Sequence, residues 1–433
     1  QNTGLNYLAY DLTSGLTGVF TPNVNPPYTP PNNPALCFPT PTLSSCARQN
    51  VDILEPGLAL PSAWKANLAF EHELPWQGIV LSAELVKTKV KDAIYIERLD
   101  LRNGAGVGAN QPGPDGRDLF WSPTSVNATT GAGFTSSARY ARPIGVGDVL
   151  LLRNTDKGES TQFTVGLNRP MQNDWSWSFG YTYTKADEVS PLTSSINASN
   201  WNGAPIFNAN ENIAYNSRYA IKDRFTGTVN WEHAFFGDYK TKVGLFYEGR
   251  SGRPYSLIFR NDMNGDGQST LNDLFYIPNE DEVVFTGGSA MAANFFAWLD
   301  DHPEFKRYQG HVAPANAFRT GFVHNFDLRI SQELPGFMKG HKSIISLDIN
   351  NVGNLLNKNW GLIDDYGFFS TARVASYSGV CRQVGTLCTA NDIGKYIYNF
   401  SSADPVQIQE NNNDKGNTAV SRWSVLATFK YEF

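Results

Sequence analysis

The last eleven residues of the chain alternate between two kinds of side chain with a period of two. The apolar and aromatic set is Trp423, Val425, Ala427, Phe429, Tyr431 and Phe433, and all but one of the residues between them are polar. A period of two places the two sets on opposite faces of a β-strand. A strand with one apolar face, at least as long as the roughly 9 to 11 residues that cross a bilayer, is the building unit of outer-membrane β-barrels.

The composition agrees with such a barrel and disfavours two other classes of protein. The 433 residues are 18% charged and 13% aromatic, with a formal net charge of -6, whereas disordered chains have few aromatic residues and a high net charge. The mean hydropathy is -0.34, and we find no apolar run of roughly 18 residues that would indicate a transmembrane helix. A barrel keeps a low mean hydropathy because only alternate residues face lipid.

The alternation recurs in four pairs of segments, which predict four long β-hairpins. The segments lie within 64–85, 163–184, 225–247 and 322–349, and their connecting turns are placed at 75–78, 172–174, 236–239 and 334–341. The clearest strand runs from Trp175 to Thr184, where aromatic residues alternate with Ser, Gly and Thr. An amphipathic helix could not carry this alternation, because its apolar residues recur every three or four positions.

The turns within the hairpins are short, whereas the connections between hairpins are long, about 30 to 70 residues. Short turns on one side and long loops on the other are typical of outer-membrane barrels. A soluble β-sandwich or propeller is the alternative, but its strands usually run about 5 to 6 residues, with short turns on both sides. We count about nine crossings, an odd number, whereas bacterial barrels have an even number of strands. We therefore expect an extracellular loop at 1–60 and the carboxyl-terminal part of a larger barrel at 61–433. The chain begins at Gln1 without a signal sequence, so we expect a mature product or a part of a longer one.

One loop has the spacing of a calcium-binding loop. Its predicted ligands are Asp262, Asn264, Asp266, Gln268, Thr270 and Asp273, with Gly267 at the sharp turn. These residues match the loop positions from which oxygen atoms converge on Ca²⁺, except that the last is Asp rather than Glu. The alternative is an ordinary turn rich in Asp, Asn and Gly. We predict bound Ca²⁺ with a structural role, because no base or nucleophile accompanies the carboxylates.

The four cysteines form two close pairs, Cys37 with Cys46 and Cys381 with Cys388, each in a loop-like stretch. Four cysteines allow three pairings, of which we predict the local one. Each disulfide would stabilise the fold by roughly 2 to 3 kcal/mol on the chain-entropy model. Zinc is the alternative, but no Cys-x-x-Cys spacing or nearby His favours it.

Other features have a structural interpretation. The segment 289–308 carries Ala292, Phe295, Phe296 and Leu299 at helical spacing, which predicts a short helix that packs the loop. Charged residues on the polar face of the strands would line the barrel interior; they include Glu71, Glu84, Arg224, Glu232, Glu248, Arg329 and Asp348. We find none of the common catalytic motifs, such as His-Glu-x-x-His or Gly-x-Ser-x-Gly. We expect neither enzyme activity nor a nucleic-acid partner.

Several segments resemble the carboxyl-terminal barrel part of TonB-dependent outer-membrane transporters, in particular the Oar-like group. They are WKANLAFEHELP at 64–75, DMNGDGQ at 262–268 with NDLFYIP at 272–278, DLRISQELP at 327–335, and NNVGNLLNKNWG at 350–361. The terminal Phe429, Tyr431 and Phe433 also resemble the signal by which such barrels are recognised for insertion. The resemblance covers roughly residues 62–433.

The resemblance implies a barrel of about 22 strands, a size at which the lumen must be plugged. It also implies an amino-terminal plug domain, energy supplied by a TonB-type complex, and a location in the outer membrane of a Gram-negative bacterium. We identify neither a plug nor a TonB box in the chain. We therefore expect transport of an unknown ligand, in either direction, with a structural or adhesive surface protein as the alternative.

Overall fold

A computed structural model of the chain describes residues 49–101, 111–122, 126–135, 146–267, 272–367, 369–401, 409–410 and 421–433. The fold is mostly β, as the sequence predicts. Among the described residues, no helix is long and apolar enough to span a membrane.

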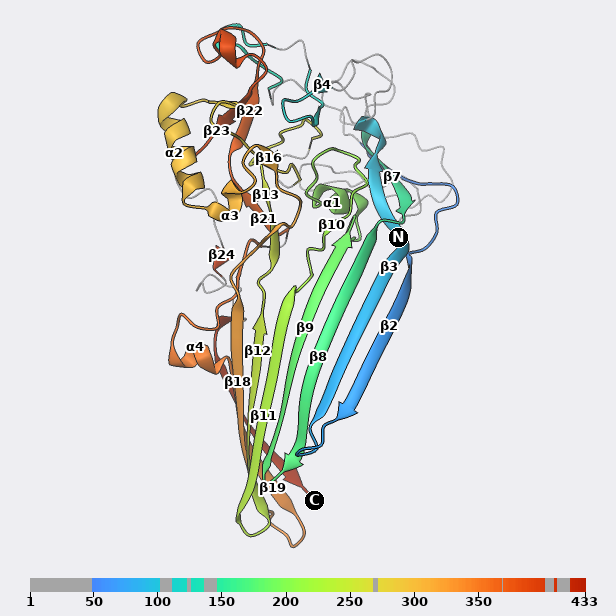
Figure 1. The fold of residues 1–433 in the computed structure, drawn as a ribbon, viewed down its shortest axis with the longest axis vertical. Coiled ribbons are helices and arrows are strands. Elements are labelled where there is room, and N and C mark those ends of the chain that lie inside the picture. Colours follow the sequence, from blue (N-terminus) through green and yellow to red (C-terminus); the bar gives the residue numbers. More distant parts are fainter. Residues whose placement is uncertain are drawn as a thin grey trace, which may run out of the picture.

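A large antiparallel sheet of long, slanted strands forms one half of the molecule (Figure 1). Successive strands pair in the order β2-β3-β8-β9-β11-β12-β18-β19-β25. Their bounds are β2 (Ser62–Glu73), β3 (Val80–Arg98), β8 (Gly158–Gln172), β9 (Trp175–Glu188), β11 (Asp223–Phe236), β12 (Tyr239–Arg250), β18 (Val323–Pro335), β19 (Lys342–Asn350) and β25 (Ser424–Glu432).

The four predicted hairpins are confirmed: β2 pairs with β3, β8 with β9, β11 with β12, and β18 with β19. The β8–β9 turn consists of Asn173 and Asp174, both with positive φ, at 51° and 68°. Positive φ at both turn positions suits a tight hairpin, and Asn and Asp tolerate it better than other non-glycine residues. These tight turns lie at one end of the sheet, the turn end, and the long connections gather at the other, the loop end (Figure 1).

The register of the sheet places the apolar residues of neighbouring strands on one face. One row across the strands joins Leu167, Phe179, Gly227, Tyr247 and Phe326. Many side chains of this apolar face are exposed, including Leu68, Phe70, Leu85, Phe163, Phe179, Leu245, Ile330, Ile345, Val425 and Phe429. An apolar face this extensive exceeds the isolated exposed hydrophobics of an ordinary soluble surface.

The opposite face is polar and is crossed by ion pairs. Arg224 pairs with Glu248 at 2.7 Å, and Arg329 pairs with Asp348 at 3.1 Å. Lys240 contacts Glu232 at 2.6 Å within the β11–β12 hairpin. The predicted charged residues of the strands therefore share the polar face.

Within the described residues, β2 and β25 each pair on one side only and are the edges of the long-strand ladder. The prediction that the terminal residues form a strand is confirmed by β25, which pairs with β19 from Ser424 to Glu432. Its apolar residues Val425, Ala427 and Phe429 oppose Ile349, Leu347 and Ile345, so it continues the apolar face. Closure into a barrel stays a prediction.

Smaller elements occupy the loop end. Strand β1 (Gln49–Leu54), within the range that the sequence predicts as loop, pairs parallel with β7 (Val146–Thr155), which in turn pairs with the end of β3. The other short strands are β4 (Gln111–Pro112), β5 (Asp118–Leu119), β6 (Ala132–Gly133), β10 (Tyr215–Asn216), β13 (Pro254–Ile258), β14 (Tyr276–Ile277), β15 (Val283–Phe285), β16 (His311–Val312), β17 (Phe318–Arg319), β20 (Asp364–Asp365), β21 (Thr371–Arg373), β22 (Ser376–Cys381), β23 (Tyr396–Asn399) and β24 (Gln409–Glu410).

The predicted helix in segment 289–308 is confirmed, although it is divided in two. Helix α2 (Gly288–Asp300) buries Phe295 and Leu299, and α3 (Pro303–Lys306) follows after a break at 301–302. Pro303 begins the second helix because its ring is accommodated in a first turn. The remaining helices are α1 (Asn197–Asn202), α4 (Val352–Leu356), and the 3₁₀ turns Leu99–Leu101 and Ala390–Asp392.

The long connections form a hydrophobic core of their own. It joins residues far apart in the chain, among them Trp121, Phe259, Phe295, Tyr377 and Tyr398, all at most 2% exposed. The loop end is therefore a packed structure that can position side chains for binding, rather than a set of independent loops.

Candidate functional site

The predicted calcium loop lies inside this packed loop end. The indole Nε1 of Trp121 donates to the carbonyl of Met263 at 2.8 Å, and the amide of Phe120 donates to the carbonyl of Asn264 at 2.6 Å. Gly265 has a φ of +83°, and a Cβ atom there would lie 2.9 Å from the Trp121 ring. The loop is thus fixed against β5 and the residues that follow it.

Asp262, the first predicted ligand, organises the turn of the loop. Its two carboxylate oxygens accept hydrogen bonds from the amides of Gly265 at 2.7 Å and Gly267 at 2.8 Å. Gly267 has a φ of 98°, which favours glycine at this position. The sequence prediction that Gly267 marks the sharp turn is confirmed.

Two further carboxylates are buried where the ends of the loop meet. Asp266 is fully buried and accepts hydrogen bonds from the side-chain amides of Asn272 at 2.8 Å and Asn264 at 3.3 Å. Asp273 is 2% exposed and accepts the amide of Met263 at 2.8 Å. The described predicted ligands Asp262, Asn264, Asp266 and Asp273 therefore lie on one short, closed segment.

Among the described residues of this segment, two oxygen atoms are buried without a hydrogen-bond partner. They are Oδ1 of Asp273 and Oδ1 of Asn272. A buried oxygen without a partner costs about 1 to 3 kcal/mol, and more for a charged group. The sequence analysis overlooked Asn272, although it immediately precedes a predicted ligand. Both oxygens are of the type that Ca²⁺ coordinates.

Two buried arginines lie beside the loop, and both already have acidic partners. Arg98 pairs with Asp100 at 2.6 Å and Asp148 at 2.8 Å, and Arg117 pairs with Asp115 at 2.8 Å. Arg98 also acts electrostatically on Asp266, and Arg117 acts on Asp273. Neither arginine was predicted, because both reach the loop from distant segments of the chain.

Carboxylates outnumber arginines among the described residues at this site. We define the acidic cluster as three loop carboxylates, three carboxylates paired with arginine, and the two arginines: Asp262, Asp266, Asp273, Asp100, Asp115, Asp148, Arg98 and Arg117. If all are ionised, two guanidiniums face six carboxylates. Burial, followed by the charges of Asp266 and Asp262, raises the pKa of Asp273 well above its ordinary value of 3.8. A divalent cation would remove this repulsion.

The residues present fit a calcium ion in charge and in ligand type. Oxygen donors of Asp and Asn are the ligands that Ca²⁺ prefers, and two of them have buried oxygens without partners. Gln268 and Thr270 lie outside the described residues. Within the described ranges, no group of three or more His, Cys, Asp or Glu residues has a ready-made metal-binding arrangement. Calcium binding therefore stays a prediction.

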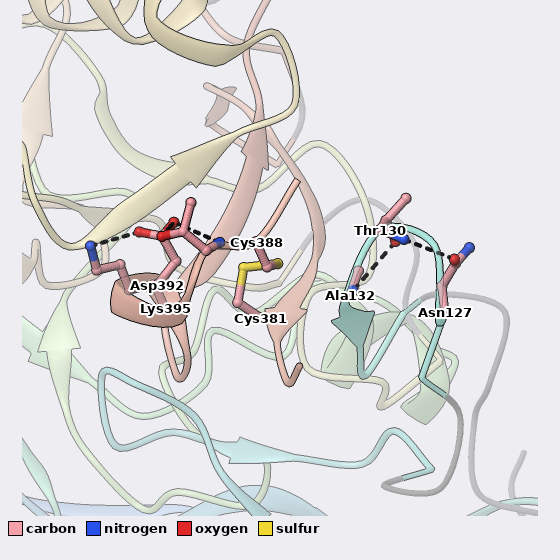
Figure 2. The surroundings of a disulfide bond; sticks show 8 residues. Asn127, Thr130, Ala132, Cys381, Cys388, Asp392 and Lys395 are labelled. Atoms are coloured by element: carbon pink, nitrogen blue, oxygen red, sulfur yellow. Dashed lines mark hydrogen bonds and ion pairs between the residues drawn. A yellow bond between two sulfur atoms is a disulfide. The ribbon is translucent and has the colours of Figure 1, made fainter. Parts of the chain in front are cut away.

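The predicted disulfide between Cys381 and Cys388 is confirmed, with an S–S distance of 2.04 Å (Figure 2). The loop that it closes packs on the turn 127–131: the amide of Cys388 donates to Thr130 at 3.2 Å, and that of Thr386 donates to Thr129 at 2.8 Å. Asn127 stabilises this turn by accepting the amide of Thr130 at 3.1 Å. The other predicted pair, Cys37 and Cys46, lies outside the described residues.

The predicted terminal signal lies at the turn end of the sheet. Phe429 and Phe433 are 60% and 97% exposed, whereas Tyr431 packs on the β18–β19 connection. The Tyr431 hydroxyl lies 2.8 Å from Nδ1 of His341, and its ring stacks on Phe337 at 5.4 Å between centroids. These contacts fix the last strand, and the recognition role of the three residues stays a prediction.

No protein-family model matches the chain, and no curated protein matches it significantly.

Proposed function

We propose that the chain is part of an outer-membrane β-barrel that transports a ligand as a TonB-dependent transporter. The observation that carries this proposal is the two-faced sheet, in which a continuous apolar face lies opposite a face of cross-strand ion pairs. Such alternation suits strands with lipid on one side and a polar lumen on the other. The resemblance to the Oar-like group supplies the transport class and the location in a Gram-negative outer membrane.

The packed loop end supports transport over a surface role. Its core holds the connections of several strands together over one end of the sheet, which is where a ligand would enter the lumen (Figure 1). The polar face below it offers charged groups such as Arg329 and Asp348 to an amino-terminal plug. Ligand capture by the loops would be followed by rearrangement of the plug, with energy from a TonB-type complex.

Calcium would have a structural role in this arrangement. Asp262, Asn264, Asp266 and Asp273 would hold the ion, together with Gln268 and Thr270. When bound, Ca²⁺ supplies two positive charges to the acidic cluster. The loop residues themselves hold the turn through the Asp262 hydrogen bonds and join its ends through Met263 and Asp273. The disulfide between Cys381 and Cys388 holds another part of the loop end together covalently.

Fractionation and uptake measurements test the proposal. The complete gene product, expressed in a Gram-negative host, should fractionate with the outer membrane and resist extraction by carbonate. Cells should then take up its ligand in an energy-dependent manner that a TonB-complex deletion abolishes. A product that fractionates as a soluble protein would overturn the membrane assignment. Outer-membrane location with surface adhesion, but without energy-dependent uptake of any tested ligand class, would favour the adhesive alternative.

A further inference from the structure

A cavity of about 340 Å³ lies at the base of the loop end, where three connections meet the long strands. Segment 218–221 of the β9–β11 connection enters β11, the two ends of the β12–β18 connection contribute 250–254 and 320–323, and the β19–β25 connection contributes Ile363 and Asp364. Arg218, Arg250 and Arg253 contribute to the lining, and Asp364 is the carboxylate among the lining residues. The lining therefore has an excess of positive charge.

Arg218 contributes a buried guanidinium to this lining. It is 2% exposed, and its Nε atom has no hydrogen-bond partner among the described residues. Its Nη2 atom donates to the carbonyl of Gly203. Burial lowers the pKa of Arg218; the charge of Glu188 opposes this change and that of Arg253 adds to it. A buried guanidinium with an unused donor is costly unless an anion or another acceptor satisfies it.

The other two arginines of the lining, Arg250 and Arg253, belong to segment 250–254. Arg250 lies directly opposite Arg224 on the polar face of the sheet, and both share Glu248, at 3.5 Å and 2.7 Å. One carboxylate therefore serves two guanidiniums. The guanidinium of Arg253 lies 5.8 Å from the centre of the Tyr219 ring. Guanidinium groups bind oxyanions through paired, charge-assisted hydrogen bonds.

We propose that this cavity binds the phosphate group of a water-soluble phosphate monoester. Three guanidiniums and one carboxylate give the lining a formal excess of two positive charges, part of which Glu248 offsets at Arg250. A phosphate monoester, which carries a charge of about −1.5 to −2 at about pH 7, suits the excess that remains. A ligand with a single carboxylate group would carry less negative charge than a phosphate monoester and would leave more of this positive charge unbalanced. Because Arg250 lies on the polar face, opposite the apolar face, the ligand comes from water rather than from a lipid headgroup.

The binding itself does not depend on transport, and only its role as a cargo site rests on the proposed function. If phosphate binds to the purified protein and uptake fails, the transport proposal is wrong while the binding site stands. If uptake occurs and phosphate does not bind, the cavity does not have the role that we assign to it.

Calorimetric titration of the detergent-solubilised full-length protein tests the site, with glycerol 3-phosphate, inorganic phosphate and acetate as probes. Wild-type protein should bind both phosphates saturably and acetate at least about tenfold more weakly. Arg253→Gln, at a half-buried position, should weaken phosphate binding by about tenfold or more. Arg218→Gln should do the same where it folds, and Arg253→Lys should restore part of the affinity because it keeps the charge.

Arg329→Gln is the matched control, because it removes the same charge from the polar face outside the cavity lining. It should leave phosphate affinity unchanged. Absence of saturable phosphate binding by the wild type would overturn the proposal. Equal weakening by Arg329→Gln and Arg253→Gln would also overturn it, since the binding would then reflect overall charge. Binding only of micelles that contain phosphatidic acid would exclude the water-soluble ligand.

Discussion

The amide of Met263 donates a hydrogen bond to Oδ2 of Asp273 at 2.8 Å, so the last predicted ligand of the calcium loop lies directly beside its first residues. The other oxygen of the same carboxylate is buried, with no hydrogen-bond partner in the part of the chain that the structure describes. The protein thus closes the loop with one oxygen of Asp273, and the second oxygen is the one that we expect to bind a ligand. This relationship leads to two predictions about the metal.

Calcium should stabilise the protein through this loop. At a Ca²⁺ concentration of 100 times Kd, the free energy of unfolding should rise by about 2.7 kcal/mol relative to protein in chelator. Asp266→Ala should abolish most of this difference, because it removes a buried carboxylate from the loop. Denaturant unfolding in detergent, with and without chelator, measures the effect. Asp300→Asn, an exposed carboxylate on α2, is the control and should keep the full calcium response. An equal response of wild type and Asp266→Ala would remove the metal assignment.

The stability of the metal-free protein should depend on the ionisation of Asp273. Because the folded state raises the pKa of this group, it binds the proton more tightly than the unfolded state does. In chelator, the contribution of Asp273 should be most favourable below about pH 4 and should decline as pH rises toward the folded pKa. The unfolding free energy of wild type minus that of Asp273→Asn, measured from pH 4 to 8, should therefore decrease as pH rises. A difference that increases with pH in chelator would contradict the buried, repelled carboxylate.

The local disulfide should stabilise the loop end rather than the long sheet. Replacing Cys381 and Cys388 with serine should destabilise the structure around the disulfide by roughly 2 to 3 kcal/mol. Hydrogen exchange should increase in the turn 127–131, whose Thr129 and Thr130 carbonyls accept amides of the disulfide loop. Exchange in β8 and β9 should not change. Alkylation of either cysteine in wild-type protein without reductant would show that the bond does not form.

Adjacent residues of β12 provide a matched test of the two faces of the sheet. Leu245 and Phe246 are each 37% exposed, but Leu245 lies on the apolar face and Phe246 lies opposite Asp327 on the polar face. In a bilayer, Leu245→Arg should cost about 2 to 4 kcal/mol, and Phe246→Arg should cost much less because it lies on the polar face, which we expect to face a lumen. Unfolding of both variants in lipid vesicles measures the costs. Equal costs would indicate that water contacts both faces.

The long strands could be predicted because their signal is local. Alternation from Trp175 to Thr184 specifies a strand, and Asn173 and Asp174 specify the turn before it, without information from distant residues. The burial of Phe295 and Leu299 in α2 follows from helical spacing in the same way. These are features in which neighbouring residues determine the conformation.

The loop end could be predicted only in part, because its structure depends on long-range contacts. The apolar run from Val149 to Leu152 is typical of a buried strand and corresponds to β7. Its parallel partner β1, however, lies about a hundred residues away in the chain. Arg98 and Arg117 have ordinary sequence surroundings, and only folding brings them beside Asp266 and Asp273. The cavity of Arg218, Arg250 and Arg253 likewise joins segments that no local pattern connects.

Lipid contact on the apolar face is the central claim, and fluorescence quenching in bilayers tests it most directly. A fluorophore attached at Leu245→Cys should be quenched by nitroxides on lipid acyl chains, whereas the same fluorophore at Phe246→Cys should be quenched by a water-soluble nitroxide instead. Quenching of the Leu245→Cys label by the water-soluble nitroxide alone would contradict the assignment of this face to lipid.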